Sequence, residues 1–136
     1  MSSIEALKAA IGQKGPPTTY EIDKSMIRRF CDAIGDKNPK WKEVMPPGLL
    51  AAAMLMGQGA MTPQWPYPGI VDAGLELEVF KPIKPGDTIT IVNELHNVED
   101  KSSERGKRLL VSFRSTIKNQ RGEVVAASTG RVMNIG

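Results

Sequence analysis

Residues 48–61 read GLLAAAMLMGQGAM, and this stretch decides the fold because it is apolar on nearly every face. It begins directly after Pro46 and Pro47, and proline is favoured at the first position of a helix. A helix that is hydrophobic all round has to be buried on every side. The sequence therefore predicts a central helix that other elements of the chain wrap.

The segments that can wrap this helix follow it. They are strand-like runs separated by the turn signals KPG, KSSERGK and NQRG, and they occupy residues 69–83, 87–99, 108–118 and 123–135. Short connections between successive strands imply antiparallel pairing. Apolar and polar residues alternate in these runs, as in LELEV at 75–79 and VSFRS at 111–115, which predicts one buried face of the sheet.

The N-terminal residues predict a helix and a linker. Ser3 is expected to cap a short helix over residues 4–11, which Gly12 ends. The segment QKGPP at 13–17 then breaks the chain before a short strand candidate, TTYEI at 18–22. These residues lack a basic start followed by a continuous apolar run, so they do not resemble a signal peptide.

A second helix is expected between Asp23 as N-cap and Gly35 as C-terminal stop. Its apolar residues fall at helical spacing and predict one buried face: Ile27, Phe30, Cys31 and Ile34. Cys31 is the single cysteine, so it forms no internal disulfide, and we assign it to the core. The elements together predict the α+β class, a curved antiparallel sheet of about five strands around a central apolar helix. One domain is expected over residues 1–136, with the N-terminal helix and linker at 1–15.

Composition argues against several classes of partner. The 18 basic and 15 acidic residues give a net charge of +3 that is spread along the chain, too weak a bias to favour nucleic acid. No stretch approaches the roughly 20 apolar residues that cross a bilayer. The one basic cluster, KSSERGKR at 101–108, is assigned to a solvated hairpin turn. We therefore expect a cytoplasmic protein that binds neither nucleic acid nor membrane.

A motif ahead of the central helix carries a family resemblance. Residues 33–41 read AIGDKNPKW, which resembles the motif G-D-x-N-P-x-H of MaoC-like dehydratases and (R)-specific enoyl-CoA hydratases. Asp36, Asn38 and Pro39 occupy the motif's Asp, Asn and Pro, and Trp41 stands where the family has its histidine. The segments that resemble the family's central-helix entry, strand-turn signature and last hairpin are 46–53, 80–87 and 119–128.

This resemblance implies a hot-dog fold and dimers whose sheets join edge to edge. It also implies an acyl-CoA or acyl-carrier thioester as substrate, with no cofactor and no metal. The partner is then either a second copy of the chain or a MaoC-like subunit that carries an intact Asp/His motif. An open strand edge needs such cover in any case, because it leaves backbone groups unpaired.

Hydration of an enoyl thioester requires a base, an acid and donors for the carbonyl oxygen. In the family, aspartate and histidine hold one water between them, and a backbone N–H at the start of the central helix contacts the thioester oxygen. The resemblance makes Asp36 the candidate base, Asn38 a residue that positions its loop, and Gly48 the candidate oxyanion N–H. Trp41 donates one hydrogen bond but cannot shuttle protons. The alternative for Asp36 and Asn38 is a turn stabilised through their own backbone.

Four residues are candidates for substrate binding: Trp41, Pro47, Met54 and Trp65. The tryptophans are more typical of packing than of ligand stacking, and methionines typically fill a core. His96 is the only histidine and lies in a strand-like run, so we assign it a structural role.

Three functions remain open at this point. The favoured one is the pocket-forming partner in a heteromeric enoyl-CoA hydratase, because the motif has lost its histidine. The second is a self-sufficient hydratase that uses Asp36, or an acyl-CoA thioesterase that uses Asp36 or Glu43 to reach a water. The third is a non-catalytic protein that binds an acyl thioester. A scaffold alone does not choose among them.

Overall fold

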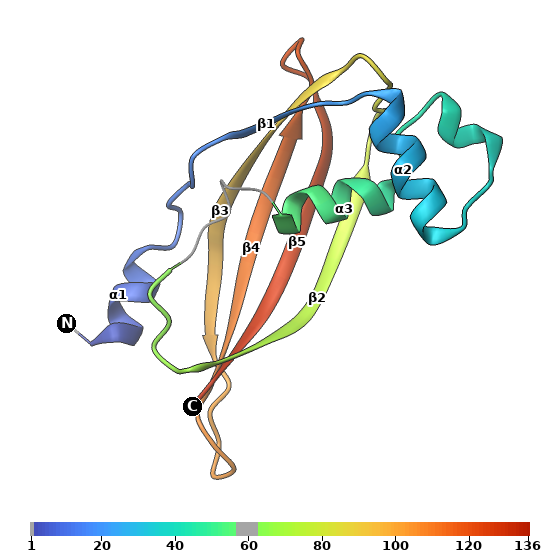
Figure 1. Cartoon of the computed structure of the whole chain (residues 1–136). Coiled ribbons are helices and arrows are strands. Elements are labelled where there is room, and N and C mark those ends of the chain that lie inside the picture. The colour runs from blue at the N-terminus through green and yellow to red at the C-terminus, as the bar shows by residue number, and fades with distance from the viewer. Residues whose placement is uncertain (1, 57–62) are drawn as a thin grey trace.

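The computed structural model describes residues 2–56 and 63–136, and the side chains of residues 54–56 are not described (Figure 1). Its strands form one five-stranded sheet in the order β1-β3-β4-β5-β2, with every neighbouring pair antiparallel. The strands are β1 Thr18–Glu21, β2 Gly69–Val79, β3 Thr88–Asp100, β4 Arg108–Lys118 and β5 Val124–Ile135. The predicted antiparallel sheet of about five strands is confirmed.

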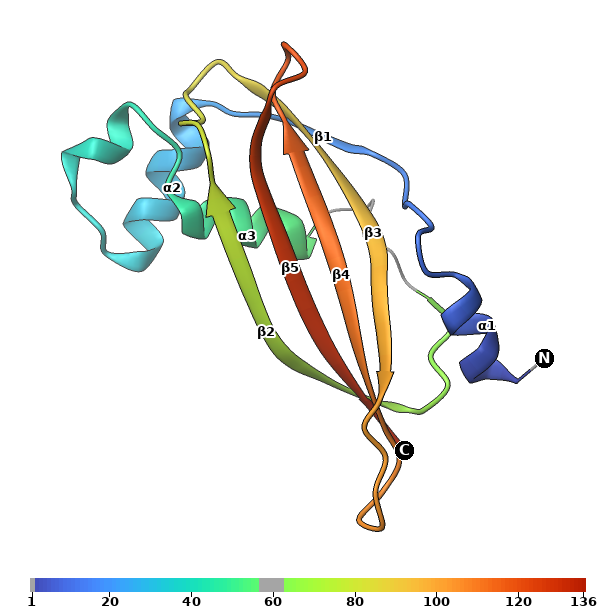
Figure 2. The same cartoon turned by 180° about the vertical axis from the view of Figure 1, so that it is seen from behind.

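The described helices lie on one face of this curled sheet. They are α1 Ser3–Ala9, α2 Lys24–Ile34, the short 3-10 helix η1 Pro39–Lys42 and α3 Pro47–Met56. Seen from behind in Figure 2, the strands lie in front of α3, which crosses their inner face. α3 begins at Pro47, one residue before the predicted start, and residues 57–61 of the predicted helix lie outside the described residues.

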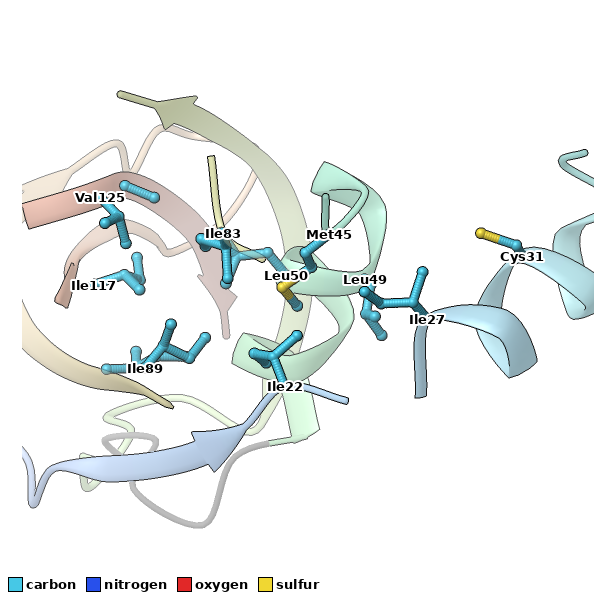
Figure 3. Close-up of a cluster of buried hydrophobic side chains, with 12 residues drawn as sticks. Ile22, Ile27, Cys31, Met45, Leu49, Leu50, Ile83, Ile89, Ile117 and Val125 are labelled. Atoms are coloured by element: carbon cyan, nitrogen blue, oxygen red, sulfur yellow. The ribbon is translucent and has the colours of Figure 1, made fainter. Parts of the chain in front are cut away.

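The main core joins the sheet, α3 and α2. Figure 3 shows Leu49 and Leu50 of α3 lying between sheet residues such as Ile117 and the α2 residue Ile27. Removing this apolar surface from water is the dominant favourable term in folding. A second cluster beneath α1 contains Leu7, Leu95, Val98, Leu109 and Val111.

The two edges of the sheet differ. The N-terminal segment covers the free side of β3. The Gly12 N–H donates to the Leu95 carbonyl at 2.8 Å, and the Gly15 N–H donates to the Asn93 carbonyl at 2.8 Å. Farther along the same side, β1 pairs with β3. β2 pairs with β5 on one side, and no described strand pairs with its other side. Several apolar side chains of β2 and its end are exposed: Ile70, Val71, Leu75, Val79 and Phe80. Such an edge is an interaction surface unless it is covered.

Three details of the predicted helices are wrong: α1 ends at Ala9 with Ala10 as its C-cap, and not at Gly12, and the other two concern Ser3 and Ile34. Ser2, not Ser3, caps α1, because its Oγ accepts from Glu5 N–H at 3.2 Å while the Glu5 carboxylate accepts from Ser2 N–H. In α2 the predicted cap Asp23 is confirmed, since it accepts from the Met26 N–H at 2.7 Å. Ile34, however, is 57% exposed, because α2 contacts the core through its earlier turns.

Candidate functional site

The backbone at the end of α2 fixes the position of Asp36. Gly35 adopts a left-handed conformation with φ of 72°, which ends the helix as predicted. The Asp36 N–H then donates to the Cys31 carbonyl at 2.9 Å, across the helix end. The carboxylate therefore projects from a backbone that is held by the last turn of α2.

The Asp36 carboxylate is bonded through both oxygens. Its Oδ1 accepts from the Asn38 N–H at 3.0 Å, and its Oδ2 accepts from the Trp41 indole Nε1–H at 2.8 Å. The residue at the family's histidine position thus contacts the candidate base directly. An indole N–H only donates, so this contact orients the carboxylate and relays no proton.

Asn38 builds the turn that brings Trp41 to Asp36. Its Oδ1 accepts from the Lys40 N–H at 3.0 Å and caps η1, whose first residue is Pro39. The Trp41 N–H donates to the Asn38 carbonyl at 3.1 Å. These bonds fit the turn interpretation of the motif, and the catalytic roles of Asp36 and Asn38 stay predictions.

Trp41 lines two cavities. One, of about 430 Å³, contains Asp36 and Asn38, and its cationic side chains are Lys24, Arg28, Lys37 and Lys42. The other, of about 250 Å³, is mostly apolar and contains Pro47, Leu50 and Ile83. The structure therefore brings the candidate substrate residues Trp41 and Pro47 together, beside the candidate base.

Gly48 lies at the second position of α3, where amide groups have no partner inside a helix. A Cβ at this position would lie 3.0 Å from Cζ of Phe30, so the absence of a side chain makes room for a ring of α2. This packing is a sufficient reason for glycine here. The role of its N–H as an oxyanion donor stays a prediction.

The remaining predicted residues lie elsewhere. Trp65 packs edge-on against Phe113, with ring centroids 6.2 Å apart, and lines a third cavity on the concave face of the sheet. The Met54 side chain lies outside the described residues. Glu43 is the exposed C-cap of η1, and His96 is exposed at a register shift of β3, so neither lines any of these three cavities.

The surroundings of Cys31 disfavour its thiolate. Burial, together with the negative charges of Asp36 and Asp32, raises the pKa of its thiol. The assignment of Cys31 to the core is confirmed, since it is 8% exposed. Across residues 2–56 and 63–136, no group of three or more His, Cys, Asp or Glu side chains is placed to hold a metal ion. In the same part of the chain, no helix is long and apolar enough to cross a membrane.

Three polar residues on the concave face were missed from the sequence: Asn93, Ser115 and Ser128. They share one cross-strand position and line the third cavity. The sequence contains a signal for one of them, because Ser115 follows Val111 and Phe113 in the alternation and therefore faces the same side of the strand. Only the register of the sheet shows that the three residues meet.

Residues 9–128 match the family described as FAS1-like, dehydratase domain region. The chain belongs to this family. Among its relatives, a UPF0336 protein of Streptomyces avermitilis is 26% identical over 137 residues, covering 88% of this chain and 89% of the relative. A probable enoyl-CoA hydratase alpha subunit of Thermomonospora curvata is 23% identical over 141 residues, covering 82% of this chain and 44% of the relative.

Solved structures agree on the fold. One chain of the ChsH1-ChsH2 complex from Mycobacterium tuberculosis aligns with a TM-score of 0.76 at 22% identity, covering 97% of this chain and 88% of that one. The MaoC-like dehydratase from Rhodospirillum rubrum aligns with a TM-score of 0.67 at 23% identity, covering 93% of this chain and 92% of that one. The predicted hot-dog fold is confirmed, and the match over residues 9–128 confirms the predicted membership of a dehydratase family.

Proposed function

We propose that this chain is the pocket-forming subunit of a heteromeric, cytoplasmic enoyl-CoA hydratase or dehydratase. A sister chain with the intact motif supplies the catalytic Asp/His pair. One observation carries the proposal: the indole of Trp41 donates to Asp36 Oδ2 at 2.8 Å, where the family pattern calls for a titratable partner.

The chemistry explains why this bond matters. Hydration needs one group to take a proton from water and another to give a proton to the substrate, and each such transfer contributes about 10²–10⁴-fold. Asp36 provides one titratable group, and the indole provides none. The sister chain therefore turns over the acyl substrate, while this chain supplies cavity walls for it, such as Pro47 beside Trp41 and Phe113 beside Trp65.

The bare edge of β2 is the surface that this subunit offers to its partner. Its charged residues Asp72, Glu76 and Glu78 are all acidic. Antiparallel pairing of two copies centred on Leu77 would place Glu76 of one copy opposite Glu78 of the other, and like charges directly opposite destabilise a strand pair. A sister chain with a basic edge strand fits better than a second copy.

The test is an assay of enoyl-CoA hydration, followed as loss of the absorbance of the conjugated thioester. The chain is assayed alone and together with a MaoC-like chain, encoded nearby, that carries the full G-D-x-N-P-x-H motif. We expect a stable complex and activity only in that complex, with Asp36→Ala in this chain costing far less than the about 10²–10⁴-fold loss expected for removal of a catalytic base.

Other outcomes would support the other functions. Hydration by the chain alone, lost with Asp36→Ala, would make it a self-sufficient hydratase. Release of free thiol, lost with Asp36→Ala or Glu43→Ala, would make it a thioesterase. Thermal stabilisation by acyl-CoA, with no turnover in any combination, would make it a binding protein.

Trp41→His tests the same observation by placing a titratable side chain at this position. It places an imidazole where the indole now contacts Asp36, so the chain alone should gain weak hydratase activity that Asp36→Ala removes. Trp65→His is the matched control, because Trp65 packs on Phe113 in a separate cavity and should give no gain.

A further inference from the structure

A polar row interrupts the apolar concave face of the sheet. Ser115 of β4 pairs with Ser128 of β5 on one side and with Asn93 of β3 on the other, and we call these three residues the polar rung. The rungs on either side are apolar: Ala126, Ile117 and Ile91 on one, and Gly130, Phe113 and Leu95 on the other. The polar rung is therefore embedded in core.

The hydrogen bonding of the polar rung leaves an acceptor at its centre. Ser115 is 8% exposed and donates its hydroxyl proton to Asn93 Oδ1. A hydroxyl oxygen carries two lone pairs that accept hydrogen bonds. Within residues 2–56 and 63–136, the Ser115 hydroxyl takes part in a hydrogen bond as the donor to Asn93, and Asn93 and Ser128 each take part in a further interaction. A ligand that satisfies this oxygen must bring a proton of its own.

The polar rung lines one part of a cavity of about 360 Å³ whose other walls are largely apolar, including Trp65, Phe113 and Val132. This combination of apolar walls with a few placed polar groups is typical of small-molecule sites. The cavity reaches β2, where Ile70 and Leu75 are 54% and 44% exposed, so a partner at that edge would cover it.

The absence of a side chain at Gly130 leaves space in this cavity. A Cβ at Gly130 would meet only Leu75 Cδ1, at the ordinary contact distance of 3.8 Å, and its backbone does not need a positive φ. Neither local crowding nor backbone conformation therefore requires glycine here. Glycine inside a strand often marks a place where a ligand approaches closely.

We propose that this cavity holds the acyl chain of the thioester and that Ser115 accepts a hydrogen bond from a hydroxyl group on that chain. The subunit then selects hydroxylated acyl chains over plain alkyl chains. This inference rests on the proposed function for the thioester, and it adds the class of acyl group. A site built to bond a hydroxyl rejects the analogue that lacks it, because its polar group is left unpaired.

Binding measurements with saturated thioesters test the inference without any turnover. The probes are straight-chain acyl-CoAs of about six to twelve carbons, each with its ω-hydroxy counterpart, so that chain length scans the depth of the hydroxyl. The protein is used in the assembly that it forms on purification, and the Kd is measured by calorimetry. At one or two lengths the hydroxyl should tighten binding by about tenfold, and at the other lengths it should weaken it.

Variants assign the effect to its residue. Ser115→Ala should abolish the tenfold advantage, and it should tighten rather than weaken the binding of the alkyl chains, because it removes the oxygen that an alkyl chain leaves unpaired. Ser112→Ala is the matched control, since Ser112 is also a buried serine of β4 but occupies a different cross-strand position, opposite Asn97 and Arg131. Gly130→Val should weaken every chain by filling the cavity.

Two results would overturn the inference: alkyl chains that bind at least as tightly at every length, or a hydroxyl preference that survives Ser115→Ala. Absence of all acyl-CoA binding to the folded protein would overturn it as well. The proposed function fails separately, through the hydration assay with the sister chain, because that assay does not depend on a hydroxyl in the substrate.

Discussion

Two loops of this molecule each use an asparagine to hold a turn, yet they differ in what surrounds it. In the loop at 35–43, Asn38 is exposed and, among the described residues, its Oδ1 accepts only from the Lys40 N–H. In the hairpin at 119–123, Asn119 is 7% exposed, and its Oδ1 accepts from the N–H groups of Arg121 and Glu123, each at 3.0 Å. The first turn is a local cap, and the second is part of the core.

The carboxylates of the two loops differ in the same way. Glu123 accepts from Lys81, Asn119 and Arg121, and these bonds, with that of Lys81 first, lower its pKa to about 2. Asp36 is bonded by a backbone amide and an indole, and it takes part in none of the salt bridges among the described residues. The hairpin has satisfied its charge within the fold, as a structural element does. The loop at 35–43 holds its carboxylate with two hydrogen bonds and no ion pair among the described residues, beside a cavity.

The largest effect should come from the buried asparagine. Asn119→Ala removes two accepted hydrogen bonds and the bond that its Nδ2 donates to Glu123, and it leaves two part-buried backbone amides without this acceptor. We expect the free energy of unfolding to fall by about 2–3 kcal/mol. Urea denaturation measures it, and a loss below about 0.5 kcal/mol, the usual effect of a surface change, would show that the hairpin is no more structural than the loop at 35–43.

A smaller effect is expected for the bond that defines the candidate site. Trp41→Phe keeps a ring against the core and removes the indole donor, so the loss should be about 1 kcal/mol. A double-mutant cycle with Asp36→Asn isolates the pair, with an expected coupling of about 0.5–1.5 kcal/mol. A coupling near zero would mean that the contact does not hold the carboxylate, and the comparison with Glu123 would then lose its basis.

These residues also show which features of the structure can be predicted from the sequence. The central helix and the strands are predicted because their hydrophobic periods and turn residues are local signals, and Asp23 and Gly35 are helix boundaries for the same reason. The bond from Trp41 to Asp36 is not predictable in this way, because the family pattern places a histidine there and the indole's direction depends on η1. The polar rung and the Lys81–Glu123 pair join separate strands and loops, so they depend on sheet register.

Removing the exposed Asn38 side chain should lower the free energy of unfolding by less than either Asn119→Ala or Trp41→Phe. Asn38→Ala removes the cap of η1 but leaves solvent free to bond the Lys40 N–H, so we expect a loss of about 0.5–1 kcal/mol. The same urea experiment compares it with Asn119→Ala. Equal losses at the two positions would contradict the distinction between a local cap and a core turn. Enoyl-CoA hydration by the complex should also be measured, because a displaced Asp36 loop would reshape the cavity that contains Trp41.

The smallest effect is the pH dependence that Glu123 of the hairpin contributes. Because the pKa of Glu123 lies at about 2 in the folded state, below its ordinary value of 4.5, its ionised form stabilises the fold above about pH 4.5. This contribution is lost as the pH falls from about 4.5 towards 2. Glu123→Gln should therefore lower the Tm at neutral pH and match the wild type near pH 2.

Lys81→Met removes the first cause of the shift, so it should raise the pKa of Glu123 and move the acid-induced loss to higher pH. A Tm difference between Glu123→Gln and wild type that stays constant from pH 6 to pH 2 would mean that the carboxylate contributes through packing and not through charge.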